Sequence, residues 1–143
     1  MSLTNAVSLV AELGDITRFR RPPQLFDYAG MVSSEYSSRD QRRQGGITKT
    51  GNPHVRRAIT EAAWAYRYPP AFKGRLAQQK QGAPQWLVDI SWRAQDRLHR
   101  RYRAMVRAHK PTPVGVTAVA RELLGFVWEI AQEVEQRQMA MAS

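Results

Sequence analysis

Serine hydroxyls and basic side chains are concentrated in one stretch of the chain, residues 31–52. A serine oxygen can attack a phosphodiester when a base, a metal ion or a neighbouring cation activates it. No residue of the chain is identified as that activator, so a catalytic serine and an ordinary serine-rich loop both stay open on the residues alone. The serines are Ser33, Ser34, Ser37 and Ser38, and the basic residues of 39–57 are Arg39, Arg42, Arg43, Lys49, Arg56 and Arg57.

A helix is predicted to begin directly after this stretch. Asn52 is a favoured N-cap, and Pro53 suits the first helical position. Glycines before it let backbone N–H groups approach an anion, and a helix start offers unpaired donors and a positive dipole end. With Lys49, Arg56 and Arg57 close by, the junction suits a nucleic-acid phosphate. An ordinary capped helix with a basic exposed face is the alternative.

Other kinds of site are excluded or disfavoured. Residues 46–51 have the glycine spacing of a P-loop, but Asn52 and Pro53 stand where Lys and Ser or Thr are needed, which excludes nucleoside triphosphate binding. The chain has no cysteine, and its 3 histidines lack metal-ligand spacing, so we expect no metal site. For the tryptophans, packing is favoured over base stacking, because all of them lie on predicted helices: Trp64, Trp86, Trp92 and Trp128.

The overall charge points to a polyanionic partner. The 143 residues include 22 Lys and Arg against 12 Asp and Glu, a formal charge of +10, which favours DNA, RNA or an anionic membrane. A hydrophobic content of 43% is that of a globular protein with its own core. The sequence has no apolar run of ~18 residues, no secretory signal and no cysteine. We therefore expect a cytoplasmic protein without a membrane span.

The elements that would position these residues form an all-α domain. Helical periodicity predicts segments at 3–13, 24–29, 53–67, 71–79, 85–108 and 113–137, with 31–52 as a loop. The link between the last two helices is short, so they should be antiparallel neighbours, with arginines of one near glutamates of the other. We expect a single domain over 1–143, in which 3–84 holds helices and the loop, and 85–137 holds the long helix pair.

Several blocks of the chain, taken in order, resemble one family. The blocks are Ala11–Phe19, Gln24–Gly30, Ser34–Ser38, Gly45–Arg57 and Glu61–Trp64. In order and spacing they are similar to the C-terminal domain of bacterial insertion-sequence transposases of the IS-one-ten group, relatives of the Piv invertase and MooV. The resemblance runs from about Leu3 to Gln132 and is strongest over 11–64.

This resemblance implies a DNA-binding domain of a site-specific recombinase whose serine becomes covalently linked to DNA. By position that serine matches Ser38, although Arg39 follows where the family has glycine, and Ser37 is the register alternative. The expected partners are DNA, a structured RNA of the element in some members, and further copies of the full-length protein. The start of the domain also resembles a helix-hairpin-helix element. The expected nucleic-acid-binding residues are Arg42, Arg43, Lys49, Asn52, Arg56 and Arg57.

The resemblance also implies a part that this chain does not carry. Full-length members have an N-terminal RuvC-like domain whose acidic residues bind Mg²⁺. We therefore expect no cofactor in this chain, no catalysis by this fragment alone, and a location at the bacterial nucleoid. Two other interpretations stay open. One is a non-catalytic helical module that binds nucleic acid or another subunit, and the other is a scaffold that dimerises through the helix pair 85–137.

Overall fold

The computed structural model describes residues 13–31, 33–38, 41–47, 51–70, 82 and 84–142, with the strand residues and Thr17 described by their backbone only. Two parts predicted as helical, 3–12 and 71–79, lie outside these residues. The described helices are η1 (Ile16–Arg18), α2 (Pro22–Tyr28), α3 (Pro53–Ala63), η2 (Trp64–Arg67), α5 (Gln85–Arg107) and α6 (Thr112–Ala142). The prediction of an all-α domain is confirmed.

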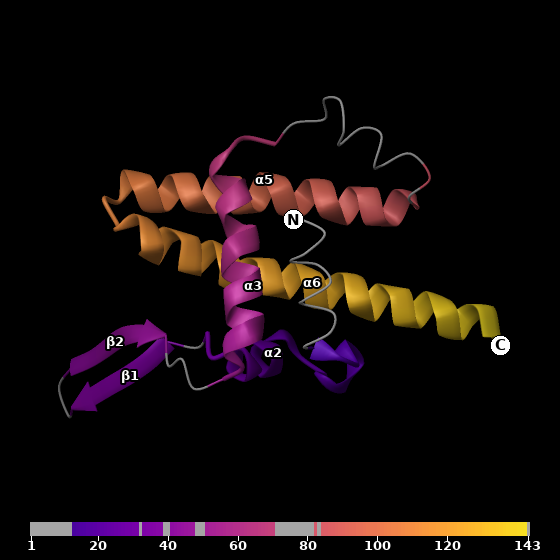
Figure 1. The fold of residues 1–143 in the computed structure, drawn as a ribbon, viewed down its shortest axis with the longest axis horizontal. Helices are drawn as coiled ribbons and strands as arrows, with labels where there is room; N and C mark the ends of the chain where they lie inside the picture. Colours follow the sequence, from indigo (N-terminus) through magenta and orange to yellow (C-terminus); the bar gives the residue numbers. More distant parts are fainter. Residues whose placement is uncertain are drawn as a thin grey trace.

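Helix α6 is the element on which the others assemble. Helices α3, α2, η1 and α5 all contact it, and Figure 1 shows α3 crossing the long α5–α6 pair. The core is made mainly of aliphatic side chains, with Phe19 among them, and segments far apart in the sequence share this one interior. Its largest fully buried side chains are Leu25, Met31, Val55, Ile59, Leu98, Val116, Val119 and Leu124.

The predicted antiparallel helix pair is present. The buried residues of α5, Ile90, Ala94 and Leu98, recur at helical spacing, and α5 packs along α6. Between the helices, His109 adopts φ 55°, and the Lys110 N–H donates to the Met105 carbonyl at 3.1 Å, which ends α5 and reverses the chain. Helix α6 runs on to Ala142 rather than ending near 137, because only good helix formers follow.

The segment predicted as a loop contains a β-hairpin. Strands β1 (Ser33–Ser38) and β2 (Gln41–Ile47) pair antiparallel, with an irregularity between Ser33 and Glu35. Periodicity detects strands that bury one face, whereas this sequence is almost wholly polar, so the pairing left no hydrophobic signal. The expectation of a loop was therefore wrong for 33–38 and 41–47, while the buried core remains that of a helical domain.

Candidate nucleic-acid interface

The hairpin sets a serine strand against a basic strand. Its register places Ser37 opposite Arg42, Tyr36 opposite Arg43, and Ser38 opposite Gln41. Residues directly opposite each other are the closest cross-strand neighbours in an antiparallel pair. The backbone therefore puts Ser37, the register alternative, directly across from a basic position, while Ser38 is the last residue of β1.

The hairpin lies at one end of the helical body. Its main contacts are between its own two strands, and Figure 1 shows it beyond the N-terminal end of α3. The chain is tied back to α2 just after the hairpin, where the Asn52 N–H donates to the Tyr28 carbonyl at 2.7 Å. The serine strand, the basic strand and the start of α3 are thus consecutive parts of one end of the molecule. Lys49 lies outside the described residues.

Asn52 is held by contacts on both ends of its amide. Its Oδ1 accepts from the N–H groups of His54 at 2.9 Å and Val55 at 3.2 Å, so the predicted N-cap is confirmed. Its Nδ2 donates to the Tyr28 hydroxyl at 3.0 Å. The side chain fixes the start of α3 and joins it to α2. Its amide oxygen and nitrogen are both engaged in these structural contacts, so a contact with phosphate would have to be made in addition to them.

The first turn of α3 has no spare backbone donor among its described residues. Pro53 has no N–H, His54 and Val55 donate to the Asn52 side chain, and the Arg56 N–H donates to the Asn52 carbonyl at 3.2 Å. The expectation of unpaired donors at this helix start was therefore wrong: a favourable Asn-Pro cap satisfies the groups that an anion would need. Binding of phosphate here would depend on side chains.

The two arginines of this turn differ in their contacts. Arg56 Nη1 donates to the Ala29 carbonyl at 3.3 Å, at the end of α2, so this guanidinium also braces the α2–α3 junction. Arg57 forms an exposed ion pair with Glu61 at 3.3 Å. Exposed pairs of this kind contribute only ~0–1 kcal/mol, so Arg57 can exchange its partner for a phosphate at low cost.

Gly51 makes the α2–α3 junction possible. A Cβ at this position would lie 2.1 Å from the Tyr28 carbonyl oxygen and 2.3 Å from the Gly30 nitrogen. Such distances are far below contact range, so the backbone reaches its place only without a side chain. We expected glycines here to let an anion approach the backbone. At Gly51 the space is instead filled by the backbone of Tyr28 and Gly30.

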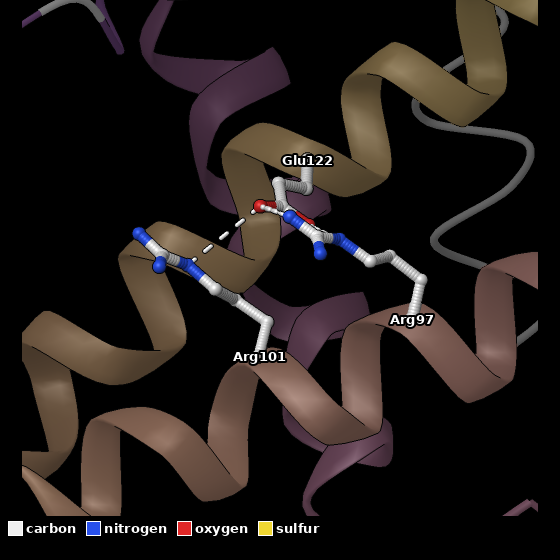
Figure 2. A network of polar contacts seen from close by, with 3 residues as sticks. All are labelled: Arg97, Arg101 and Glu122. Atoms are coloured by element: carbon white, nitrogen blue, oxygen red, sulfur yellow. Dashed lines mark hydrogen bonds and ion pairs between the residues drawn. The ribbon is translucent and has the colours of Figure 1, made fainter.

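Arginines of α5 that lie beside α6 form ion pairs with glutamates of α6, as predicted. Figure 2 shows Arg97 gripping Glu122 through two hydrogen bonds of 3.1 Å, while Arg101 approaches the same carboxylate at 3.6 Å. Arg93 pairs with Glu129. These exposed ion pairs bridge the two helices and contribute only ~0–1 kcal/mol each, but they offset part of the positive charge that a nucleic acid would meet.

The tryptophans do not behave alike. Trp128 is half-buried and donates through Nε1 to the Phe19 carbonyl at 2.7 Å, so packing is confirmed for it. Trp64 and Trp92 are 36% and 41% exposed, so their side chains are covered for the larger part but are less buried than the core residues. Helical location alone predicted burial, whereas the side of the helix decides it. Tyr68, 62% exposed beside Trp64, was not singled out from the sequence.

Among the residues that the structure describes, carboxylates and histidines do not gather into a metal site. Within the described ranges, no group of three or more such residues could hold a metal ion, and no helix there is long and apolar enough to cross a membrane.

Comparison with known proteins places the chain in a family. A model of the family described as "Transposase IS116/IS110/IS902 family" matches residues 1–76, more than half of the 143 residues. A Sinorhizobium fredii protein named "Putative transposase y4qE" is 43% identical over 136 residues, which is 95% of this chain and 35% of the relative.

A second relative, the transposase for insertion sequence element IS1533 of Leptospira borgpetersenii, is 26% identical over 99 residues, 68% of this chain and 29% of that protein. The chain thus spans about a third of the length of these relatives. No solved structure matches it. The match over the hairpin, the α2–α3 junction and α3 shows that this chain belongs to the IS116/IS110/IS902 family of transposases.

Proposed function

We propose that this chain is the part of a DNA transposase that binds the DNA backbone and supplies a serine nucleophile. Ser38 is the proposed nucleophile and Ser37 its alternative. The observation that carries the proposal is the hairpin register, which pairs a strand ending in these serines with a strand that begins Gln41-Arg42-Arg43. Family membership and the net charge of +10 support DNA as the substrate.

The chemistry is a transesterification. The serine oxygen forms a bond to the scissile phosphorus, the bond from phosphorus to one DNA oxygen breaks, and the serine proton ends on that leaving oxygen. Attack by a DNA hydroxyl on the serine phosphodiester reverses the step and exchanges strands. Arginines of β2 would stabilise the negative charge that develops on the phosphoryl oxygens.

The described residues do not fit a metal centre, so no step is assigned to a metal in this chain. We assign Mg²⁺ to an N-terminal RuvC-like domain of the whole protein. The proposed setting is a homo-oligomer in the bacterial cytoplasm, at the nucleoid, with a structured RNA of the element as a second partner. This chain alone is expected to bind DNA and to leave it uncut.

The serine assignment is tested in the whole transposase that contains this chain. A denaturing gel of the protein with labelled element-end DNA should show a covalent protein–DNA species. Ser38→Ala should abolish that species, and Ser37→Ala should leave it if the assignment to Ser38 is right. The reverse pattern selects Ser37. A covalent species that survives the double substitution would refute a nucleophile in this hairpin.

A non-catalytic binding module is the second candidate, because the exposed Arg57, paired only with an exposed Glu61, offers a phosphate contact that needs no serine. It predicts that Ser37→Ala and Ser38→Ala leave recombination intact. Arg42→Ala and Arg43→Ala should weaken DNA binding under both candidates, and each lost phosphate contact should reduce the salt slope of binding by about 0.9.

A further inference from the structure

We propose that the corner formed by η2 and the C-terminal half of α5 binds unpaired nucleotides of a single-stranded nucleic acid. We name as the aromatic corner Trp64, Arg67 and Tyr68. Its rings would stack on bases, and arginines of α5 would hold the phosphates. The inference rests on the proposed function only in taking a polynucleotide as the partner, and it concerns a different surface from the hairpin.

The aromatic corner presents two rings and one guanidinium to solvent. The Arg67 guanidinium carbon lies 5.4 Å from the centre of the Trp64 ring and 4.9 Å from that of Tyr68. Trp64 is 36% exposed and Tyr68 is 62% exposed. The Arg67 guanidinium covers part of one face of each ring and holds the ring in place, and the exposed remainder of each ring is available for stacking on a base. Every base offers a π-face, so such a platform accepts any sequence.

The charge of Arg67 is not answered by a carboxylate within the described part of the chain. The matched case elsewhere is Arg137, which lies 4.8 Å over the Trp86 ring and also pairs with Glu133 at 3.0 Å. The charge of Arg137 is therefore neutralised by Glu133, whereas the charge of Arg67, in the same kind of cation–π contact, has no carboxylate partner among the described residues. A polyanion would favour the second.

Basic residues of α5 continue this surface. His99 Nδ1 donates to the Tyr66 carbonyl at 3.1 Å, since a carbonyl can only accept, and this contact seats η2 on α5 one turn before Arg103. Arg103 and Arg107 follow on one face of α5 at helical spacing, Lys110 lies just beyond the end of the helix, and all three are exposed. None of them has an acidic partner in the described ranges, in contrast to Arg97 and Arg101 on the seam with Glu122.

Two features favour unpaired nucleotides over a duplex. The bases of a duplex are stacked on each other, so their faces are closed to protein rings, whereas splayed bases can stack on aromatic and guanidinium planes. The corner also lies at the opposite end of α3 from the hairpin, roughly 16 Å away for 11 helical residues. A single strand leaving a bound duplex at the hairpin can follow the exposed face of α3 to reach it.

The test uses the 143-residue chain and fluorescence anisotropy with labelled dT20, rU20 and a 20-base-pair duplex. Tyr68→Ala and Arg67→Ala should each weaken single-strand binding about tenfold, the range expected for one stacked base. Duplex binding should change less than twofold. Tyr68→Phe keeps the ring and should bind as the unaltered chain does. Trp86→Ala, the matched aromatic beside a neutralised arginine, should also be unchanged, and circular dichroism checks that each variant is folded.

Each outcome decides the inference. Loss with rU20 alone assigns the corner to RNA, loss with dT20 alone assigns it to single-stranded DNA, and loss with both supports either source. Unchanged single-strand binding in folded Tyr68→Ala and Arg67→Ala would overturn it. The double variant Arg42→Ala with Arg43→Ala separates the two proposals. If it loses duplex binding while Tyr68→Ala leaves single-strand binding unchanged, only the hairpin proposal is supported. If the unaltered chain does not bind duplex but its single-strand binding depends on Tyr68, only the aromatic-corner proposal is supported.

Discussion

Replacing Asn52 separates its structural contacts from any contact with DNA. The side chain accepts two backbone hydrogen bonds at the start of α3 and donates one to the Tyr28 hydroxyl. Loss of an N-cap costs ~1 kcal/mol, and loss of a part-buried side-chain hydrogen bond costs about another 1 kcal/mol. Asn52→Ala should therefore lower the free energy of unfolding by about 2 kcal/mol.

Asn52→Ser provides the matched control. Its hydroxyl can cap the helix but is too short to reach Tyr28, so the loss should be about 1 kcal/mol. Tyr28→Phe should show the same loss, and combining it with Asn52→Ser should add little, because both remove one shared hydrogen bond. Urea unfolding followed by far-ultraviolet circular dichroism measures all four values.

The same variants are then tested for duplex DNA binding at several salt concentrations. If Asn52 acts by positioning α3, folded Asn52→Ser should bind within twofold of the unaltered chain, with the same salt dependence. Stability that changes by less than ~0.5 kcal/mol in Asn52→Ala, against the ~1 kcal/mol typical of a lost cap, would refute the capping argument. A clear loss of affinity in a variant of unchanged stability would instead make Asn52 a DNA contact.

Four further outcomes follow from the packing. Gly51→Ala should destabilise the fold by more than ~2 kcal/mol in urea unfolding, because its Cβ would lie 2.1 Å from a backbone oxygen. Gly125→Ala, whose Cβ would sit at an ordinary 3.6 Å, should stabilise α6 by ~0.5–1 kcal/mol. Trp128→Phe should cost about 1 kcal/mol, because the part-buried Phe19 carbonyl loses its 2.7 Å donor and keeps the longer 3.4 Å bond from Gln132. Burial raises the pKa of the Tyr66 hydroxyl above its usual value of 10.0. The unfolded chain therefore loses this proton at a lower pH than the folded chain, and the free energy of unfolding should fall as pH rises past about 10. Urea unfolding at alkaline pH should show a smaller fall for Tyr66→Phe.

The helix pair could be read from the sequence because its signal is local. Apolar residues repeat at helical spacing along α5, and a short link fixes the direction of α6. The pairing of α5 arginines with Glu122 and Glu129 followed from the same registers. The cap at Asn52 was also readable, because capping depends on one residue type at one place.

The candidate site was less predictable because its geometry depends on contacts between distant residues. The bonds from Asn52 and Arg56 to α2 cross long stretches of chain, and no spacing rule announces them. The hairpin escaped notice because its pairing uses backbone groups rather than an apolar face. The partial exposure of Trp64 likewise depends on how η2 packs against α5 and α3, which helical location alone did not predict.

The packing of α6 against η1, α2 and α3 determines how much of the chain must fold together. The family model ends at residue 76, yet the interior shared by α2 and α3 is closed by Val116, Val119 and Leu124, and the Phe19 carbonyl is bonded by Trp128. A fragment cut at the end of the matched region would expose that apolar surface to water. A segment that is transferred between genes and still folds by itself must therefore include α6, and it is longer than the matched residues 1–76.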